Sequence, residues 1–103
     1  MAEIEISKHG SSTTVRPVKN IVSSTVPDIR SEIKALIAEG VKDIVIDLEM
    51  VEIMDSMGIG LFISAHNSLL RAGGKLMVIN ASKDLLDLFK AMRLDQHFNI
   101  SGS

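Results

Sequence analysis

The sequence contains no cysteine. This absence excludes disulfide bonds, thiolate catalysis and metal sites built on thiolates. Aromatic residues are scarce, with three Phe and neither Trp nor Tyr, so the chain lacks the stacking platforms that bind single-stranded nucleic acids. The formal net charge of −2 also disfavours nucleic acid and acidic membrane surfaces as partners.

Long apolar runs are absent as well. None approaches the roughly 18 residues that a transmembrane helix requires, and residues 1–20 lack the basic-then-apolar pattern of a secretory signal peptide. We therefore expect a cytoplasmic protein without membrane insertion. The three histidines, His9, His66 and His97, show no metal-ligand spacing, so we expect neither a metal nor another cofactor.

The residues that are present suffice for one domain. The chain has 103 residues, of which 46% are hydrophobic, and a domain of that size can bury one real core. Residues 3–8 alternate polar and apolar side chains, which predicts a half-buried strand. Residues 13–18 predict a returning strand after a turn, and Pro17 predicts that this strand has an edge or a bulge there.

Helical periodicity predicts the first helix over residues 26–39. Its apolar stripe consists of Ile29, Ile33, Leu36 and Ile37, and Thr25 with Asp28 matches a capping box. A second helix is predicted from Ser56 to about Arg71. A third helix follows Ser82 as its N-cap, with an expected inner face of Leu85, Leu88, Phe89 and Met92.

Short apolar segments within residues 44–48 and 75–80 predict two buried strands. The strand–helix–strand order from 44 to 80 predicts a parallel pair, whereas the first two strands form an antiparallel hairpin. The predicted fold is therefore α/β, with a mixed central β-sheet, helices packed against it and the order ββαβαβα(β). The last strand would lie in residues 97–100, and residues 101–103 are expected to form a disordered tail.

The most informative segment is Met54-Asp55-Ser56-Met57-Gly58-Ile59-Gly60. It follows the carboxyl end of a buried strand and opens a helix, a position where ligands and partners bind in α/β sheets. We expect Ser56 to be the N-cap. Gly58 and Gly60 each lower helix stability by up to about 1 kcal/mol. That cost indicates either a close approach of a partner to the backbone or only close packing of the helix on the sheet.

The run Ile44-Val45-Ile46-Asp47-Leu48, followed by Asp55-Ser56-Met57-Gly58, resembles the signature of STAS domains. Ala72-Gly73-Gly74-Lys75-Leu76, the Leu-rich third helix and Thr25-Val26-Pro27-Asp28 fit the same family. The resemblance extends over about residues 3–100, which implies a single STAS-like domain at 1–100. Within the family the chain looks like the anti-sigma-factor-antagonist type.

The resemblance implies a regulatory binding protein whose phosphorylation site is Ser56. A partner serine protein kinase, commonly an anti-sigma factor, would bind the unphosphorylated form and release the phosphorylated form, and a metal-dependent serine phosphatase would reset the switch. The expected partner-binding residues are Asp55, Met57, Gly58, Gly60 and Leu61. Many relatives carry acidic residues before the first helix, whereas residues 19–22 are Lys-Asn-Ile-Val here, so the partner can differ. The alternative is a non-phosphorylated STAS subunit that acts as a structural partner in a signalling or lipid-transport assembly.

No enzymatic interpretation is supported. Ser56 lacks a Gly-x-Ser-x-Gly setting, and His66 lies ten residues further along the same predicted helix, too far for a nucleophile–base pair. A phospho-accepting Asp47 or Asp55 would need a metal held by further acids, which the first strands do not supply. We interpret Asp47 as a strand-end residue that bonds backbone amides. The domain is expected to be a monomer or weak dimer, with Met57 exposed and Met50, Met54, Met77 and Met92 in or near the core.

Overall fold

The computed structural model describes residues 4–102. Over this range the chain forms five strands, three α-helices and one 3-10 helix in the order ββαβαβα followed by a last β. This order confirms the predicted fold, including the final strand. The elements are β1 (Ile4–His9), β2 (Ser12–Pro17), α1 (Val26–Ala38), β3 (Asp43–Asp47), α2 (Ser56–Arg71), β4 (Lys75–Ala81), α3 (Lys83–Ala91), η1 (Leu94–Gln96) and β5 (Asn99–Gly102).

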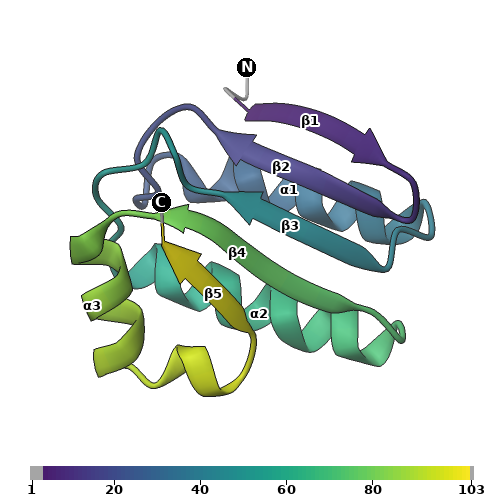
Figure 1. The fold of residues 1–103 in the computed structure, drawn as a ribbon. Coiled ribbons are helices and arrows are strands. Elements are labelled where there is room, and N and C mark those ends of the chain that lie inside the picture. The colour runs from purple at the N-terminus through teal and green to yellow at the C-terminus, as the bar shows by residue number, and fades with distance from the viewer. Residues whose placement is uncertain (1–3, 103) are drawn as a thin grey trace.

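The strands form one mixed sheet in the order β1-β2-β3-β4-β5 (Figure 1). β1 and β2 pair antiparallel, whereas β2–β3, β3–β4 and β4–β5 pair parallel. The carboxyl ends of β2, β3 and β4 therefore meet at one edge of the sheet, and the loops that follow β2 and β3 leave from that edge. This edge positions the segment that contains Ser56.

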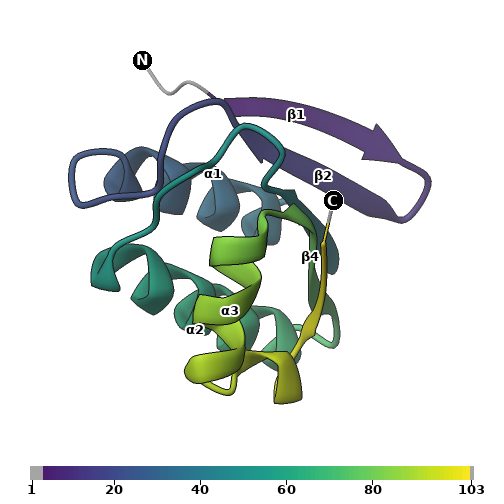
Figure 2. The same cartoon turned by 60° about the vertical axis from the view of Figure 1, so that its left-hand side comes forward.

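All three α-helices lie on the same side of the sheet (Figures 1 and 2). Burial alternates along β2 and β3, so that Val15, Ile44 and Ile46 are buried beneath the helices. Phe62 of α2 and Phe89 of α3 stack with their ring centroids 5.8 Å apart and complete this core. The period of two in the strands and the helical period in α1 and α2 thus converge on one layer of apolar side chains.

Pro17 ends β2 and lies beyond the last β2–β3 pair at Val15, so the side of β2 that faces β3 is a free edge at this position, as the sequence predicted. Three other sequence-based expectations about local structure are wrong. Thr25 forms no capping box, because it has helical angles and its hydroxyl donates to the carbonyl of Asn20 at 2.6 Å. Met50 and Met92 are 48% and 52% exposed instead of lying in or near the core.

The third difference concerns the end of the chain. Ser101 and Gly102 are part of β5, and Gly102 pairs with Ala81 of β4, so these two residues are not a disordered tail. The unpaired edge of β4 provides the hydrogen-bonding partners that order them. Residue 103, and residue 3 at the start of the predicted first strand, lie outside the described residues.

Candidate functional site

Asp55, rather than Ser56, is the N-cap of α2. Its backbone is extended, and its Oδ1 accepts hydrogen bonds from the amides of Met57 at 2.9 Å and Gly58 at 3.1 Å. Ser56 is the first residue of the helix. The expectation that Ser56 caps α2 is therefore wrong, because a carboxylate that precedes the helix reaches the second and third amides directly.

The same carboxylate connects α2 to the loop between β2 and α1. Asp55 Oδ2 accepts from the amide of Ser23 at 3.0 Å. Ile21 and Met54 form an isolated parallel bridge, and Asn20 Oδ1 accepts from the amides of Glu52 at 3.0 Å and Ile53 at 3.1 Å. Within residues 19–22, which lack acidic side chains, Asn20 and Ile21 thus support the segment before Ser56.

Ser56 itself is exposed. Within residues 4–102 its hydroxyl makes no hydrogen bond, because Asp55 directs its oxygens to backbone amides. His66 is half-buried and packs against Phe98 at a ring-centroid distance of 5.3 Å. The Ser56 hydroxyl is therefore accessible, and His66, ten residues further along α2, packs elsewhere.

The two glycines near Ser56 differ in how much space surrounds them. A β-carbon on Gly58 would lie 2.6 Å from Met54 Cγ and 2.8 Å from the carbonyl oxygen of Ile21. A β-carbon on Gly60 would meet no atom within 4 Å. Close internal packing thus accounts for Gly58, whereas nothing in the described part of the domain requires a glycine at position 60.

The predicted partner-binding residues do not all reach the surface. Leu61 is only 2% exposed and belongs to the core, and Gly58 is buried. Neither can contact a partner through a side chain, so the prediction of a contact at Leu61 is wrong. Leu61 lies on the side of α2 that faces α1, where it borders a groove with Ile33 and Ile37. Ser56, Met57 and Gly60 are exposed, and Asp55 is half-buried.

Sequence reasoning missed two exposed apolar side chains beside this site. Met50 and Ile53, in the loop before α2, are 48% and 58% exposed, and Met57 in the first turn is 51% exposed. We call Met50, Ile53, Ser56 and Met57 the switch surface. Periodicity cannot assign exposure within a loop, but an apolar residue at 53 between polar Glu52 and the buried Met54 was an available signal.

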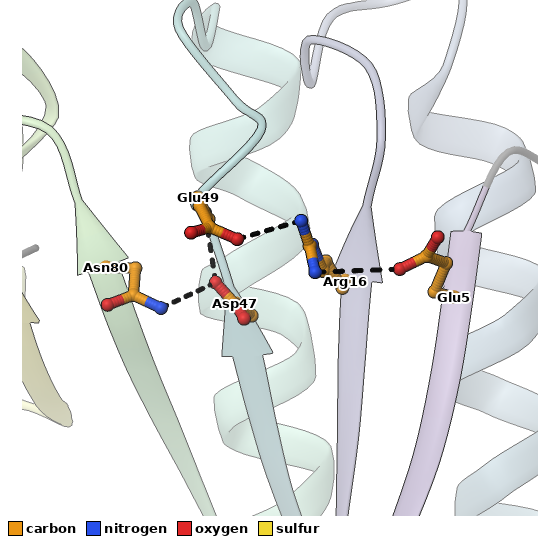
Figure 3. A network of polar contacts seen from close by, with 5 residues as sticks. All are labelled: Glu5, Arg16, Asp47, Glu49 and Asn80. Carbon is orange, nitrogen blue, oxygen red and sulfur yellow. Dashed lines mark hydrogen bonds and ion pairs between the residues drawn. The ribbon is translucent and has the colours of Figure 1, made fainter.

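A polar network holds the start of the same loop (Figure 3). Asp47 Oδ1 accepts from the amide of Glu49 and from Asn80 Nδ2, both at 3.0 Å, which confirms that Asp47 is a strand-end residue bonded to backbone. Arg16 forms two ion pairs: its Nη2 lies 2.8 Å from Glu49 Oε1, and its Nη1 lies 3.7 Å from Glu5 Oε1. These carboxylates are engaged with donors, and in the described range no three His, Cys, Asp or Glu side chains group as metal ligands would.

Comparison with known proteins identifies the family. The STAS domain family model matches residues 3–103. The chain belongs to the STAS domain family. It is 29% identical over 77 residues to the anti-sigma-B factor antagonist of Staphylococcus aureus, a match that covers 75% of this chain and 71% of that protein.

Solved structures show the same STAS fold. An anti-sigma factor antagonist from Mycobacterium paratuberculosis superposes with a TM-score of 0.87 at 21% identity, over 100% of this chain and 87% of that one. The unphosphorylated anti-sigma factor antagonist SpoIIAA superposes with a TM-score of 0.76 at 22% identity, over 97% and 87% of the two chains. Bacillus SpoIIAA in its phosphorylated form gives 0.75 at 21% identity, over 94% and 89%. Across residues 4–102 of this STAS domain, no helix combines the length and apolarity needed to span a membrane.

Proposed function

We propose that this STAS domain is a phosphorylation-switched regulatory binding protein of the anti-sigma-factor-antagonist type, with no catalytic activity of its own. It binds a partner serine protein kinase or anti-sigma factor while Ser56 is unphosphorylated, and it releases that partner once Ser56 carries a phosphate. The observation that carries the proposal is the exposed Ser56 hydroxyl at the first residue of α2, with no hydrogen bond within residues 4–102.

The switch surface has the chemistry of a protein contact. Met50, Ile53 and Met57 are each about half exposed on the loop and first turn that surround Ser56. Large exposed apolar side chains are a feature of interaction sites, and methionine adapts its shape to a partner. Asp55 fixes the first turn, and Gly60 leaves room beside it.

A phosphate on Ser56 would change this contact strongly. It adds about −1.5 to −2 charges at pH 7. The amides of Met57 and Gly58, which could otherwise bind an anion, already bond to Asp55. The phosphate therefore stands outward beside a second anion, and a partner that binds an apolar surface must desolvate it.

The remaining parts of the proposal follow the family. Its relatives include antagonists of anti-sigma factors, and structures of SpoIIAA exist in both an unphosphorylated and a phosphorylated form. We propose a cytoplasmic location, a monomeric or weakly dimeric state, and a metal-dependent serine phosphatase that removes the phosphate. Nucleic acid and membrane insertion have no part in this function.

Kinase assays with each serine kinase of the anti-sigma-factor type from the same genome test the proposal. Mass spectrometry of the treated wild-type protein should locate the phosphate on Ser56. Ser56→Ala should abolish incorporation, whereas Ser31→Ala, which removes an exposed hydroxyl on α1, should leave it unchanged. If no such kinase modifies Ser56, the proposal fails and the non-phosphorylated structural subunit becomes the better interpretation.

A further inference from the structure

The exposed side of α2 carries a regular series of positions, of which the proposed switch uses only the first. Successive members are four and three residues apart in alternation, and all of them are exposed. This spacing places them on one line along the helix and is the spacing at which a second helix packs against it. We call this series the α2 seam; it consists of Ser56, Gly60, Ile63, Asn67 and Leu70.

The far half of the seam borders a cleft that is lined by both apolar and polar side chains. Ile63 and Leu70 are 39% and 55% exposed, and Met92 on the other side of the cleft is 52% exposed. The cleft has a volume of about 510 Å³ and is lined by Ile63, His66, Asn67, Leu70, Met92, Leu94, His97 and Phe98. Of the seven large apolar side chains exposed in the described range, only Ile6 lies away from the switch surface, the seam and this cleft.

Gly60 leaves room for another backbone to come close to the seam. Glycine in a helix lowers the stability of that helix, and the open space around position 60 shows no internal need for it. Gly58, two residues earlier, does have an internal reason, because a β-carbon there would clash with Met54 and Ile21. A small residue at an exposed seam position is what a closely packed second helix requires.

One flank of the seam is cationic. α2 contains no carboxylate from Ser56 to Arg71. Arg30 of α1 faces it and donates from Nη1 to Ser64 Oγ at 3.4 Å, and Lys34 of α1 borders the same groove between the two helices. Within residues 4–102 neither cation pairs with a carboxylate.

Two acidic residues in and just after α1 lie away from this groove. Asp28 of α1 borders a hollow together with Ile4 and Pro17, and Glu39, which follows α1, pairs with Lys8 of β1 at 3.8 Å. The cleft beyond Ile63 and Leu70 is also lined without a carboxylate. The surface around the seam therefore favours a partner with negative charge along its sides.

We propose that the α2 seam docks an amphipathic α-helix of the partner protein, with apolar residues toward Ile63, Leu70 and Met92 and acidic residues toward Arg30 and Lys34. The helix approaches most closely at Gly60. The proposal rests on the proposed function, because the occupant is the same partner whose binding Ser56 controls. A phosphate on Ser56 lies at one end of the seam and repels an acidic helix there. A second copy of α2 fits poorly, since it would bring Arg71 and no acid to this cationic flank.

Two synthetic helical peptides test the seam without the natural partner. Both carry leucines at the same four-and-three spacing; one has glutamates on its flanks and the other has lysines. Titration of the isotope-labelled domain, followed by NMR, should shift the amides of Gly60, Ile63, Asn67 and Leu70 with the glutamate peptide, and the lysine peptide should bind at least about tenfold more weakly. Equal binding of the two peptides, or shifts confined to other surfaces, would overturn the proposal.

Three variants of the seam and its flank, together with one control variant, test the proposal further. Leu70→Ser should weaken the glutamate peptide about tenfold, whereas Ile6→Ser, which changes an exposed apolar residue on β1, should not. Gly60→Ala should raise the melting temperature yet weaken binding, because it strengthens the helix and blocks close approach. Arg30→Gln with Lys34→Gln should remove the preference for glutamate. Unchanged binding in Leu70→Ser and Gly60→Ala would exclude the seam.

The outcomes of these assays also distinguish a failure of this proposal from a failure of the proposed function. If the peptide binds the seam but no kinase modifies Ser56, the switch fails and the docking surface stands. If Ser56 is phosphorylated but Leu70→Ser leaves binding of both the peptide and the kinase unchanged, the seam fails and the switch stands. Self-association in analytical ultracentrifugation that disappears in Leu70→Ser would identify a second copy as the occupant and would also overturn the proposal.

Discussion

At the scale of single residues, Asp55 does more than its neighbour Ser56 to hold the site in place. One of its oxygens caps α2 at two amides, and the other accepts from Ser23 in the loop before α1. We expect Asp55→Ala to lower the free energy of unfolding by about 1 kcal/mol for the lost cap alone. The lost bond to Ser23 should add to this. Urea denaturation followed by circular dichroism measures the change.

Asp55→Asn is the matched control for this prediction. Asparagine caps helices about as well as aspartate does, so this variant should retain most of the stability. Ser56→Ala should unfold like the wild type, since Ser56 is exposed and caps nothing. If Asp55→Ala is as stable as Asp55→Asn, the cap described here contributes nothing to stability.

The two glycines of α2 make a paired prediction. Gly58→Ala should destabilise the domain by about 1–3 kcal/mol, because its β-carbon overlaps Met54 and a backbone oxygen that cannot move freely. Gly60→Ala should stabilise it by up to about 1 kcal/mol, since alanine favours the helix and meets no atom. Thermal unfolding of both variants measures these changes. Melting-temperature shifts of the same sign in the two variants would contradict the prediction.

At the scale of elements, the irregular end of β4 positions both the loop between β3 and α2 and the strand β5. The β4–β5 register shifts between Val78 and Ala81, and Asn80 between them has a φ of 59°. Asparagine tolerates this left-handed conformation better than most residues. Its side chain also donates to Asp47, at the end of β3, from which the loop to Ser56 departs (Figure 3).

Substitutions at Asn80 should separate its two roles. Asn80→Ala should lower the free energy of unfolding by about 1–2 kcal/mol, because it strains the backbone and loses the bond to Asp47. Asn80→Gly relieves the strain and loses only the bond, so its effect should be smaller. Chemical denaturation of the two variants measures the difference. A larger effect for glycine would show that backbone strain at position 80 is not important.

The elements themselves were largely predictable from the sequence. The alternation in β2 and β3, the apolar stripe of α1 and the Ser82 cap of α3 all obey local rules, and Ser82 Oγ does accept from the amide of Leu85 at 3.2 Å. These features were predictable because the local preferences of the side chains agree with the final fold.

The site was less predictable, because contacts distant in sequence determine it. Asp55 outcompetes Ser56 as the cap while also reaching Ser23, 32 residues away. Thr25 bonds Asn20 instead of capping α1, and Met92 is exposed because α3 ends at Ala91. The exposure of Met50 and Ile53 follows from a loop held by Asn20, which no periodicity describes.

At the scale of the whole molecule, the loops that carry the switch surface are tied to the sheet. Residues 20 and 21 bond the segment at 52–55 through side-chain and backbone contacts, and Asp47 anchors the start of that loop. A charge added at Ser56 therefore acts mainly on what approaches the surface. This arrangement favours a switch that works through the contact itself, without a rearrangement of the fold.

A negative charge at position 56 should leave the fold intact. Ser56→Asp should remain folded, because Ser56 is exposed and Asp55 still accepts hydrogen bonds from the first-turn amides. The variant should nevertheless bind the partner kinase poorly, since a desolvated anion without a matching cation costs several kcal/mol, or a hundredfold or more in affinity. Ser56→Ala should bind constitutively. Isothermal titration calorimetry of both variants against the kinase, with circular dichroism of each, measures these effects.

The decisive quantity is the difference in partner affinity between Ser56→Asp and Ser56→Ala. Aspartate supplies one negative charge where a phosphate supplies about two, so Ser56→Asp should weaken binding less than the phosphate does. Phosphorylated wild type should therefore bind more weakly than Ser56→Asp, and Ser56→Asp more weakly than Ser56→Ala. Ser31→Asp places the same charge on exposed α1 and should leave affinity near that of the wild type. Equal affinities for Ser56→Asp and Ser56→Ala, with both folded, would mean that charge at position 56 does not control the partner.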